Sequence, residues 1–409
     1  YHLPFDLSKG TEEGEYFFNA SFTLGEDTSW AEKGYEVAAT QIQLPVGGRS
    51  KRKAQEVKAI MKTVSGEDRV TCENERLSCE FSLKEGTFTR LSYEGKDVLC
   101  GRSFENVVEL QVYRAPTSND EHSPSGIGEN GWIKLKLNRM EKKVIESKVL
   151  EVNEHHSLVD THILYTCAAD TGFYYYALYD IAADGNIRMK LLIQPYGRLN
   201  TLPRIGIRLI CDQRLENLRW FGRGPGESYP DRKTAALIGD YRSTVSEQNE
   251  HYVIPQENAN KEDVRFVILT DGEGEGIHVK ADTLISFSAL HFTADDLTVT
   301  THDGQLVPRE ETILSLDYQQ NGLGNSSCGG DVMEEYRLQP LETAYQLSIT
   351  PYTEAQDPYS IVTDFAGLPS IEDVFTVDHS ISLQKEERSV RRPFDPSDDD
   401  ERKRAGFEV

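Results

Sequence analysis

The sequence predicts an all-β protein whose large antiparallel sheets pack face to face. Three observations support this class. Short apolar or alternating runs recur along the chain, turn signals separate them at hairpin-like intervals, and long amphipathic helices are nearly absent. The turn signals are Glu85-Gly86, Glu94-Gly95, Asp184-Gly185-Asn186 and Asp271-Gly272.

Each expected strand is a short run rich in β-branched, aromatic or aliphatic residues. In chain order, the clearest runs are residues 15–18, 35–38, 77–81, 107–113, 173–179, 187–193 and 204–209. The fifth and sixth of these flank Asp184-Gly185-Asn186, so we expect a β-hairpin at that position.

Length and charge limit the classes of protein to consider. At roughly 150 residues per domain, 409 residues suit two or three domains, or one large all-β domain with additions. The net charge of −24, from 44 basic and 68 acidic residues, argues against nucleic acid or an anionic membrane as a partner. We see neither an apolar run near membrane-spanning length nor a leader pattern, and expect no membrane association.

Composition changes along the chain divide it into four parts. Residues 1–46 read as a few strands, and residues 47–66 begin with a polar, basic stretch that suits a linker. A continuous series of strands fills residues 67–351. Residues 352–409 are predicted to be a poorly ordered, charged tail, in which a few apolar runs before residue 383 could dock on the body.

The six cysteines are scattered, without a CxxC pair or the Cys/His spacing of a zinc site. This favours free thiols in a reducing compartment, and therefore a cytoplasmic protein. A cross-strand pair of Cys72 and Cys79 is the alternative. We find no phosphate-binding loop, dinucleotide fingerprint, HExxH, GxSxG or EF-hand loop, and the residues alone therefore identify no catalytic or metal-binding group.

Four loop segments combine Gly and Pro turns with aromatic and polar residues. They are 113–120, running on to Trp132; 220–233; 252–258, closed by 263–265; and 322–330. Sugar subsites are built from such parts, because an aromatic ring covers the apolar face of a sugar while Asn, Asp, Glu and Arg bind its hydroxyls. For any single segment, a rigid turn held by Asp–Arg or Glu–Arg pairs is the favoured interpretation.

Taken together, these segments resemble the carboxy-terminal part of the large bacterial-type β-galactosidases of glycoside hydrolase family two. The motifs, in this order, are RAPTSND (114–120), GRGPGESYPDR (222–232), YVIPQE (252–257) and GLGNSSCG (322–329). Upstream, residues 19–44 resemble the end of the immunoglobulin-like domain that precedes the last domain of these enzymes.

The resemblance implies a fold for this chain and places the catalytic residues outside it. Residues 67–351 would form a large antiparallel super-sandwich similar to galactose mutarotase, and residues 1–46 part of an immunoglobulin-like β-sandwich. The catalytic Glu pair, and the magnesium and sodium that family enzymes use, would belong to a (β/α)₈ barrel outside this sequence. The chain itself is thus expected to hold no catalytic residue, metal or cofactor, and to be inactive alone. Its implied partners are that barrel-containing part, in cis or in trans, a galactoside and other subunits of an oligomer.

The resemblance also marks residues expected to line or support the sugar pocket. They are Arg114, Asn119, Asp120, Trp132, Glu227, Tyr229, Asp231, Arg232, Glu257 and Cys328. Asn119 and Asp120 are the best candidates for touching a ligand or the catalytic domain. For Arg232 with Asp231 or Glu227, a buried structural pair is favoured.

Two positions depart from the family pattern. Ser118 replaces an Asp, and Cys328 stands nearest to where some relatives place a Trp against the sugar. Residues 121–128 correspond to a mobile segment near the sugar site in relatives.

Three functions remain open from the sequence. The first is the carboxy-terminal portion or small subunit of a β-galactosidase, which hydrolyses terminal β-D-galactosides such as lactose. The alternative is a stand-alone carbohydrate-binding module without hydrolase activity. An aldose mutarotase ranks last, because no matching motif contains its acid/base pair.

Overall fold

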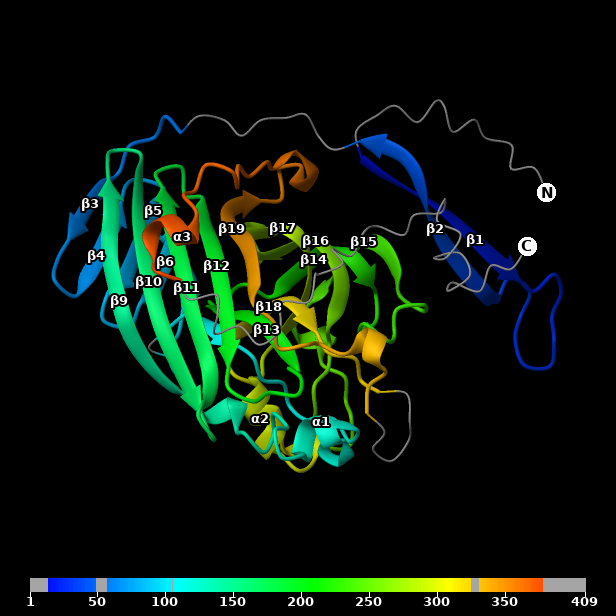
Figure 1. Ribbon diagram of the computed structural model, residues 1–409. Coiled ribbons are helices and arrows are strands. Elements are labelled where there is room, and N and C mark those ends of the chain that lie inside the picture. Colours follow the sequence, from blue (N-terminus) through cyan, green and yellow to red (C-terminus); the bar gives the residue numbers. More distant parts are fainter. Residues whose placement is uncertain (1–13, 49–56, 105, 325–330, 378–409) are drawn as a thin grey trace.

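The computed structural model describes residues 14–48, 57–104, 106–324 and 331–377 of the chain. Its elements are mostly antiparallel strands, with a few short helices, so the predicted all-β class is confirmed (Figure 1). The body of the protein, β3–β19, is one hydrogen-bonded network of strands that folds over on itself as a super-sandwich.

The strands of the body form two layers and a meander. The first layer contains β9 (Glu141–Val152), β10 (His156–Cys167), β11 (Thr171–Ala182), β12 (Ile187–Tyr196) and β19 (Thr343–Thr353). The second contains β8 (Val108–Gln111), β13 (Arg204–Cys211), β18 (Thr312–Gln320), β17 (Glu275–Leu290), β16 (Lys261–Thr270), β14 (Asn217–Gly224) and β15 (Leu237–Thr244). The meander of β3 (Lys62–Ser65), β4 (Arg69–Glu73), β5 (Leu77–Ser82), β6 (Thr87–Tyr93) and β7 (Lys96–Cys100) joins β13 through the Leu99–Cys211 pair.

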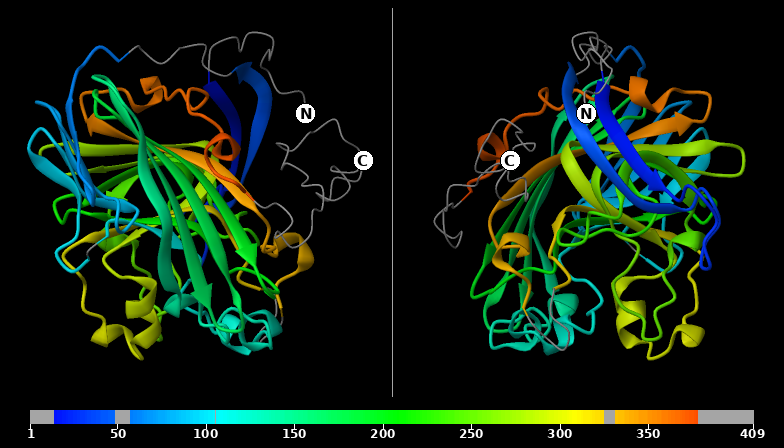
Figure 2. Two further views of the ribbon diagram at one scale, coloured as in Figure 1. Left: turned by 60° about the vertical axis from the view of Figure 1, so that its left-hand side comes forward. Right: turned by 90° about the vertical axis from the view of Figure 1, so that its right-hand side faces the viewer.

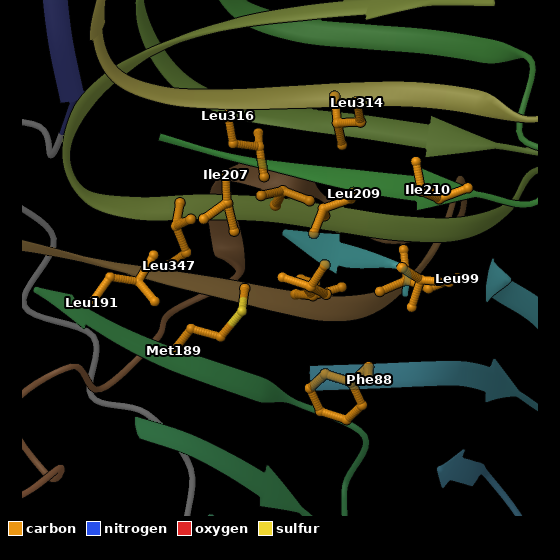
Figure 3. Close-up of a cluster of buried hydrophobic side chains, with 14 of the residues drawn as sticks. Phe88, Leu99, Met189, Leu191, Ile207, Leu209, Ile210, Leu314, Leu316 and Leu347 are labelled. Carbon is orange, nitrogen blue, oxygen red and sulfur yellow. The ribbon is translucent and has the colours of Figure 1, made fainter. Parts of the chain in front are cut away.

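One long strand connects the layers. Residues 275–281 of β17 pair with β19, whereas residues 286–290 pair with β18. The core fills the space between the layers: Met189, Leu191 and Leu347 of the first face Ile207 and Leu316 of the second (Figure 3). Burial of this continuous apolar volume is the main stabilising term for the body.

Local sequence signals explain most of the strands. Inward residues of β5 and β14 alternate with more exposed ones, which is the period of a half-buried strand. The predicted hairpin at Asp184-Gly185-Asn186 joins β11 to β12. Gly185 has a φ of +94°, a left-handed conformation that disfavours other residues, and a Cβ there would lie 2.9 Å from Pro351.

Two predicted boundaries differ in the structure. The linker predicted for 47–66 ends earlier, because Lys62–Ser65 forms β3 and pairs with β4. Residues 352–377 of the predicted tail lie on the body, as its apolar runs suggested, and include η7 (Pro358–Ser360) and α3 (Ile371–Val374). Ile371 and Phe375 cover outward-facing Tyr176, Leu178 and Leu192 of the first layer, which explains why β11 is buried on both faces. Residues 378–409 are outside the described part.

The amino-terminal segment forms a separate two-stranded sheet of β1 (Gly14–Thr23) and β2 (Glu36–Gly48). The Gln41 side-chain amide exchanges two hydrogen bonds of 2.8 Å with the backbone of Ile238, and Arg265 Nε donates to Glu15 at 2.7 Å. These polar contacts attach the hairpin beside β15 (Figure 1).

The helical elements are short. Besides η7 and α3, they are α1 (Pro124–Ile127), α2 (Ala294–Val299), η2 (Asp120–His122), η3 (Leu137–Arg139), η4 (Ser246–Gln248), η5 (Asp303–Gln305) and η6 (Glu334–Tyr336). Within the described ranges, no helix reaches the length and apolar character needed to cross a bilayer. The loops that carry α1 and α2 lie at one end of the body (Figures 1 and 2).

Candidate functional site

The four loop segments are far apart in the sequence, but the structure brings their described residues together beyond one end of the strands. Arg114 in the first segment binds the backbone at the start of the fourth, through Gly322 O and the preceding Asn321 O. The backbone N–H of Glu257 donates to Ala115 O at 3.1 Å, which joins the third segment to the first. The second joins the residues after the third where Ser228 N donates to Asn260 O at 2.7 Å.

Arg114 is the centre of the first contact. Its side chain is 0% exposed, and its Nε and Nη2 donate to the two carboxylate oxygens of Asp120 at 3.0 and 2.7 Å. Nη1 and Nη2 also donate to Asn321 O and Gly322 O at 2.9 and 3.0 Å. Asp120 accepts a further bond from Thr117 N at 3.0 Å. Both carboxylate oxygens of Asp120 are thus used inside the protein, in the bidentate geometry typical of a strong Arg–carboxylate pair.

Asp231 and Asn119 hold the start of the fourth segment. The carboxylate of Asp231 accepts hydrogen bonds from Leu323 N at 3.0 Å and Gly324 N at 2.8 Å, and Asn119 Nδ2 donates to Leu323 O at 3.0 Å. A Cβ on Gly322 would lie 2.7 Å from Asp231 Oδ2, so this close approach requires glycine. Asp231 therefore binds backbone rather than its neighbour Arg232.

Glu227 joins the second and third segments. Its carboxylate accepts from Arg232 Nη1 at 2.8 Å, the Tyr252 hydroxyl at 2.5 Å, Ala259 N at 3.1 Å and the Tyr229 hydroxyl at 3.3 Å. The side chain of Glu227 is 4% exposed, whereas that of Arg232 is 56% exposed. The structural pair considered from the sequence is therefore Glu227 with Arg232, and only its carboxylate end is buried.

Glu257 belongs to a second buried network that the sequence did not reveal. Its carboxylate accepts from Arg204 Nη1 at 3.3 Å and from Gln320 Nε2 at 3.0 Å. Arg204 also binds Asp317, with Nε to Oδ1 at 3.0 Å, and Gln320 Nε2 donates to Asn260 Oδ1 at 3.0 Å. Arg204 lies in β13, and Asp317 and Gln320 lie in β18; the sequences of both strands are typical of ordinary strands. The one signal in the sequence that could have identified this network is the charge of Arg204, directly after Pro203 at the start of a strand.

The remaining predicted site residues lie elsewhere or outside the described part. Trp132 is fully buried in the main core, where its ring and that of Tyr113 form an edge-to-face pair with centroids 5.6 Å apart. Cys328 is outside the described residues, and the other five cysteines are free thiols, with Cys72 directly opposite Cys79 in neighbouring strands. Residues 120–127 contain η2 and α1, capped by Ser123.

This arrangement fixes the position of loops. The carboxylate of Glu227 accepts hydrogen bonds from the second and third segments, and that of Asp231 accepts from the fourth. Asp120 binds Arg114 within the first segment, and Glu257 binds Gln320 of β18. Buried polar groups that are fully paired in this way rigidify a site. The segments therefore form a preorganised platform, with the guanidinium of Arg232 at its surface.

One group of carboxylates has spacing that could suit a metal ion. Among the described residues, the carboxylates of Asp271, Glu273 and Glu275 lie together after β16. The Lys96 ammonium contacts all three, at 2.7 Å from Glu275 and 3.5 Å from Asp271. A cation supplied by the protein therefore already occupies the space between these carboxylates.

Comparison with known proteins finds related sequences over most of the chain. The family model described as β-galactosidase small chain matches residues 73–350, and that of β-galactosidase domain 4 matches residues 1–45. A β-galactosidase of Halalkalibacterium halodurans is 30% identical over 359 residues, which are 85% of this chain and 34% of the relative. A β-galactosidase of Priestia megaterium is 28% identical over 338 residues, 82% of this chain and 31% of the relative. The chain thus spans about a third of the length of these relatives.

Some solved structures match most of this chain, with low TM-scores and low sequence identity. Galactose 1-epimerase from Lactobacillus acidophilus NCFM has a TM-score of 0.35 and 11% identity, covering 73% of this chain and 99% of that one. An aldose epimerase homologue from C. elegans has a TM-score of 0.38 and 10% identity, covering 72% and 99%. The family assignment rests instead on the family model, which takes in all four converging segments and the strands that carry them: this chain belongs to the β-galactosidase small chain family.

Proposed function

We propose that this chain is the carboxy-terminal portion or small subunit of a β-galactosidase, and that it shapes the sugar site of that enzyme. In this proposal, the catalytic Glu pair lies in a barrel-containing part that the chain meets through the end of the body where the four segments converge. The complete enzyme hydrolyses terminal β-D-galactosides such as lactose, with a carboxylate pair acting on the glycosidic bond.

The convergence of the four segments carries the proposal. Loops that serve only as connections do not need buried Arg–carboxylate pairs to hold them, whereas a surface that completes another domain's pocket must be held to within a fraction of an ångström. Asp231 supplies this support, because its carboxylate fixes two consecutive backbone N–H groups of the fourth segment. The family assignment and the third of each relative that the chain spans agree with a partial polypeptide.

Complementation in trans tests the proposal. We expect the purified chain alone to be inactive on nitrophenyl-β-galactoside, and to restore hydrolysis when mixed with the barrel-containing part of a family member. A pair that co-elutes in gel filtration but stays inactive would refute a role in completing the site.

A matched pair of variants sharpens the test. Asp231→Asn weakens the hold on the fourth segment, whereas Asp184→Asn alters a carboxylate that also accepts a backbone N–H, from Asn186 at 3.0 Å, in the β11–β12 turn. We expect Asp231→Asn to lower the restored kcat/KM by about tenfold, through the loss of a charge-assisted hydrogen bond, and Asp184→Asn to leave it unchanged. Equal effects would show that the platform contributes only stability.

A further inference from the structure

A cavity of about 240 Å³ in the body is lined by none of the residues of the four segments. It is lined by Arg219, Ile268 and Thr270 of β14 and β16, by Arg242 and Ser243 of β15, and by the chain at the end of β19. The second segment begins within β14, at the residue after Arg219, and its platform residues Glu227 and Asp231 follow the end of this strand at Gly224. In Figure 1 these strands lie in the right half of the body, and the loops with α1 and α2 are below them.

The floor and rim of the cavity differ in burial and packing. Ile268, Thr270 and Tyr352 are each buried, and Ile268 and Tyr352 belong to a small apolar cluster of their own, so the floor is packed in place. At the rim, the side chains of Arg242 and Glu354 are 61% and 56% exposed and meet in one contact of 3.4 Å. A long, exposed ion pair of this kind contributes little to stability, and both groups can turn to other partners.

The charges around the cavity are balanced. Arg219 is held by Asp240 through two hydrogen bonds of 2.8 and 2.6 Å, and Arg242 faces Glu354. An anion would have to displace these carboxylates on a chain whose net charge is −24. A hydroxyl group, in contrast, donates to a carboxylate and accepts from a guanidinium at the same time, so neighbouring hydroxyls of a neutral ligand match the rim.

The volume limits the ligand further. Pockets for drug-sized molecules are roughly 300–1,000 Å³, so a cavity of about 240 Å³ suits a smaller molecule. The Ser243 hydroxyl is also in the lining, and adds a group that can both donate and accept.

We propose that this cavity binds a neutral polyhydroxylated ligand the size of one hexose unit, with Arg242 and Glu354 as its main hydrogen-bonding partners. This site is separate from the platform and does not depend on the proposed function. Because the ligand replaces a long ion pair and rim water, the affinity is weak, with a Kd of about 1–10 mM.

Titration of the full 409-residue chain with galactose and with glucose tests the proposal, using ligand-observed saturation-transfer NMR. The double variant Arg242→Ala/Glu354→Ala removes both rim partners. Its control is Arg102→Ala/Glu310→Ala, which removes another ion pair with both side chains more than half exposed. We expect the rim variant to bind at least about tenfold more weakly, from two lost hydrogen bonds to charged groups, and the control to bind like the parent.

The other outcomes overturn the proposal. They are no saturation transfer from either sugar, equal binding by the rim and control variants, or displacement of the sugar by inorganic phosphate, which would indicate an anion site. Binding that survives the rim variant but is lost in Asp231→Asn would place the sugar at the four segments. That result would reject the cavity and leave the proposed function standing, whereas failed complementation with rim-dependent binding would do the reverse.

Discussion

Arg114 and His278 are both fully buried, and the protein accommodates the two side chains in different ways. Arg114 keeps its charge because a carboxylate and two carbonyl oxygens from other parts of the chain surround it. His278 lies in β17, and its ring centroid is 5.2 Å from that of Phe266. Neither ring nitrogen has a hydrogen-bond partner among the described residues. Burial, together with nearby Lys280, lowers its pKa to about 3, so the ring is neutral at ordinary pH.

This difference shows that one buried polar group organises the surrounding loops, whereas the other is only tolerated by its neighbours. At the platform, the buried groups Arg114, Glu227 and Glu257 each contact a distant part of the chain, at Gly322, Tyr252 and Gln320 respectively. At His278 the neighbours are aromatic rings, which pack against the imidazole without satisfying it. We therefore expect the two regions to respond in opposite directions when the buried polar group is removed.

The largest expected effect is at Arg114. Arg114→Ala leaves the Asp120 carboxylate buried without its partner, along with two carbonyl oxygens, and should lower the free energy of unfolding by about 3–5 kcal/mol. Urea unfolding at pH 7 measures the loss. Arg102→Ala, at an exposed pair, is the control and should change stability by at most about 0.5 kcal/mol.

Arg114→Lys separates charge from geometry. Lysine keeps the positive charge but cannot bind a carboxylate in the bidentate manner of arginine. We therefore expect the free energy of unfolding of Arg114→Lys to lie between those of the parent and Arg114→Ala. If Arg114→Ala were as stable as Arg102→Ala, the platform would not depend on its buried charges, and the comparison with His278 would fail.

The next largest effect concerns Asp263, in the stretch that closes the third segment. Its carboxylate binds Arg223 Nε at 2.5 Å and Lys233 Nζ at 2.8 Å. Although burial raises the pKa of Asp263, these two cations lower it to about 2. The unfolded carboxyl titrates near 3.9, so the stabilisation, about 2 kcal/mol, is fully present above that value and is lost as the pH falls from about 4 to 2.

Asp263→Asn removes this titration. We expect the variant to be less stable than the parent at pH 7, with the difference shrinking as the pH approaches 2. Denaturant unfolding at several pH values gives the curve, and Asp184→Asn, in the distant turn, should leave its shape unchanged. A difference that is the same at every pH would mean that the charge of Asp263 does not matter.

Some of this organisation could be predicted from the sequence. The β11–β12 hairpin follows from Asp184-Gly185-Asn186 between two apolar runs, because the turn needs a positive φ that Gly185 supplies. The candidate residues in the four segments were chosen through the family resemblance, and the structure shows contacts that join Arg114, Asp231, Glu227 and Glu257 to other segments.

Other features depend on contacts that no local pattern contains. Arg204 reads as one residue of a strand, and its role appears only when β18 places Asp317 beside it. The docking of α3 depends on apolar side chains on the outer face of β11 and β12, whose exposure cannot be read from runs that are apolar throughout. The change of partner along β17 is likewise a property of the whole sheet.

The smallest expected effect at neutral pH is at His278. His278→Phe keeps an aromatic ring next to Phe266 and removes two buried nitrogens. We therefore expect the free energy of unfolding to rise by about 1 kcal/mol at pH 7. The folded pKa of about 3 lies below the unfolded value near 6.5; the unfolded chain therefore binds the proton first, and the parent loses stability as the pH falls through that window. His278→Phe should remove this part of the acid slope, measured as unfolding free energy between pH 7 and 4, while His251→Phe, at an exposed histidine, should not reproduce the gain. A loss of stability in His278→Phe would mean that the cluster requires the imidazole, and that His278 resembles Arg114 after all.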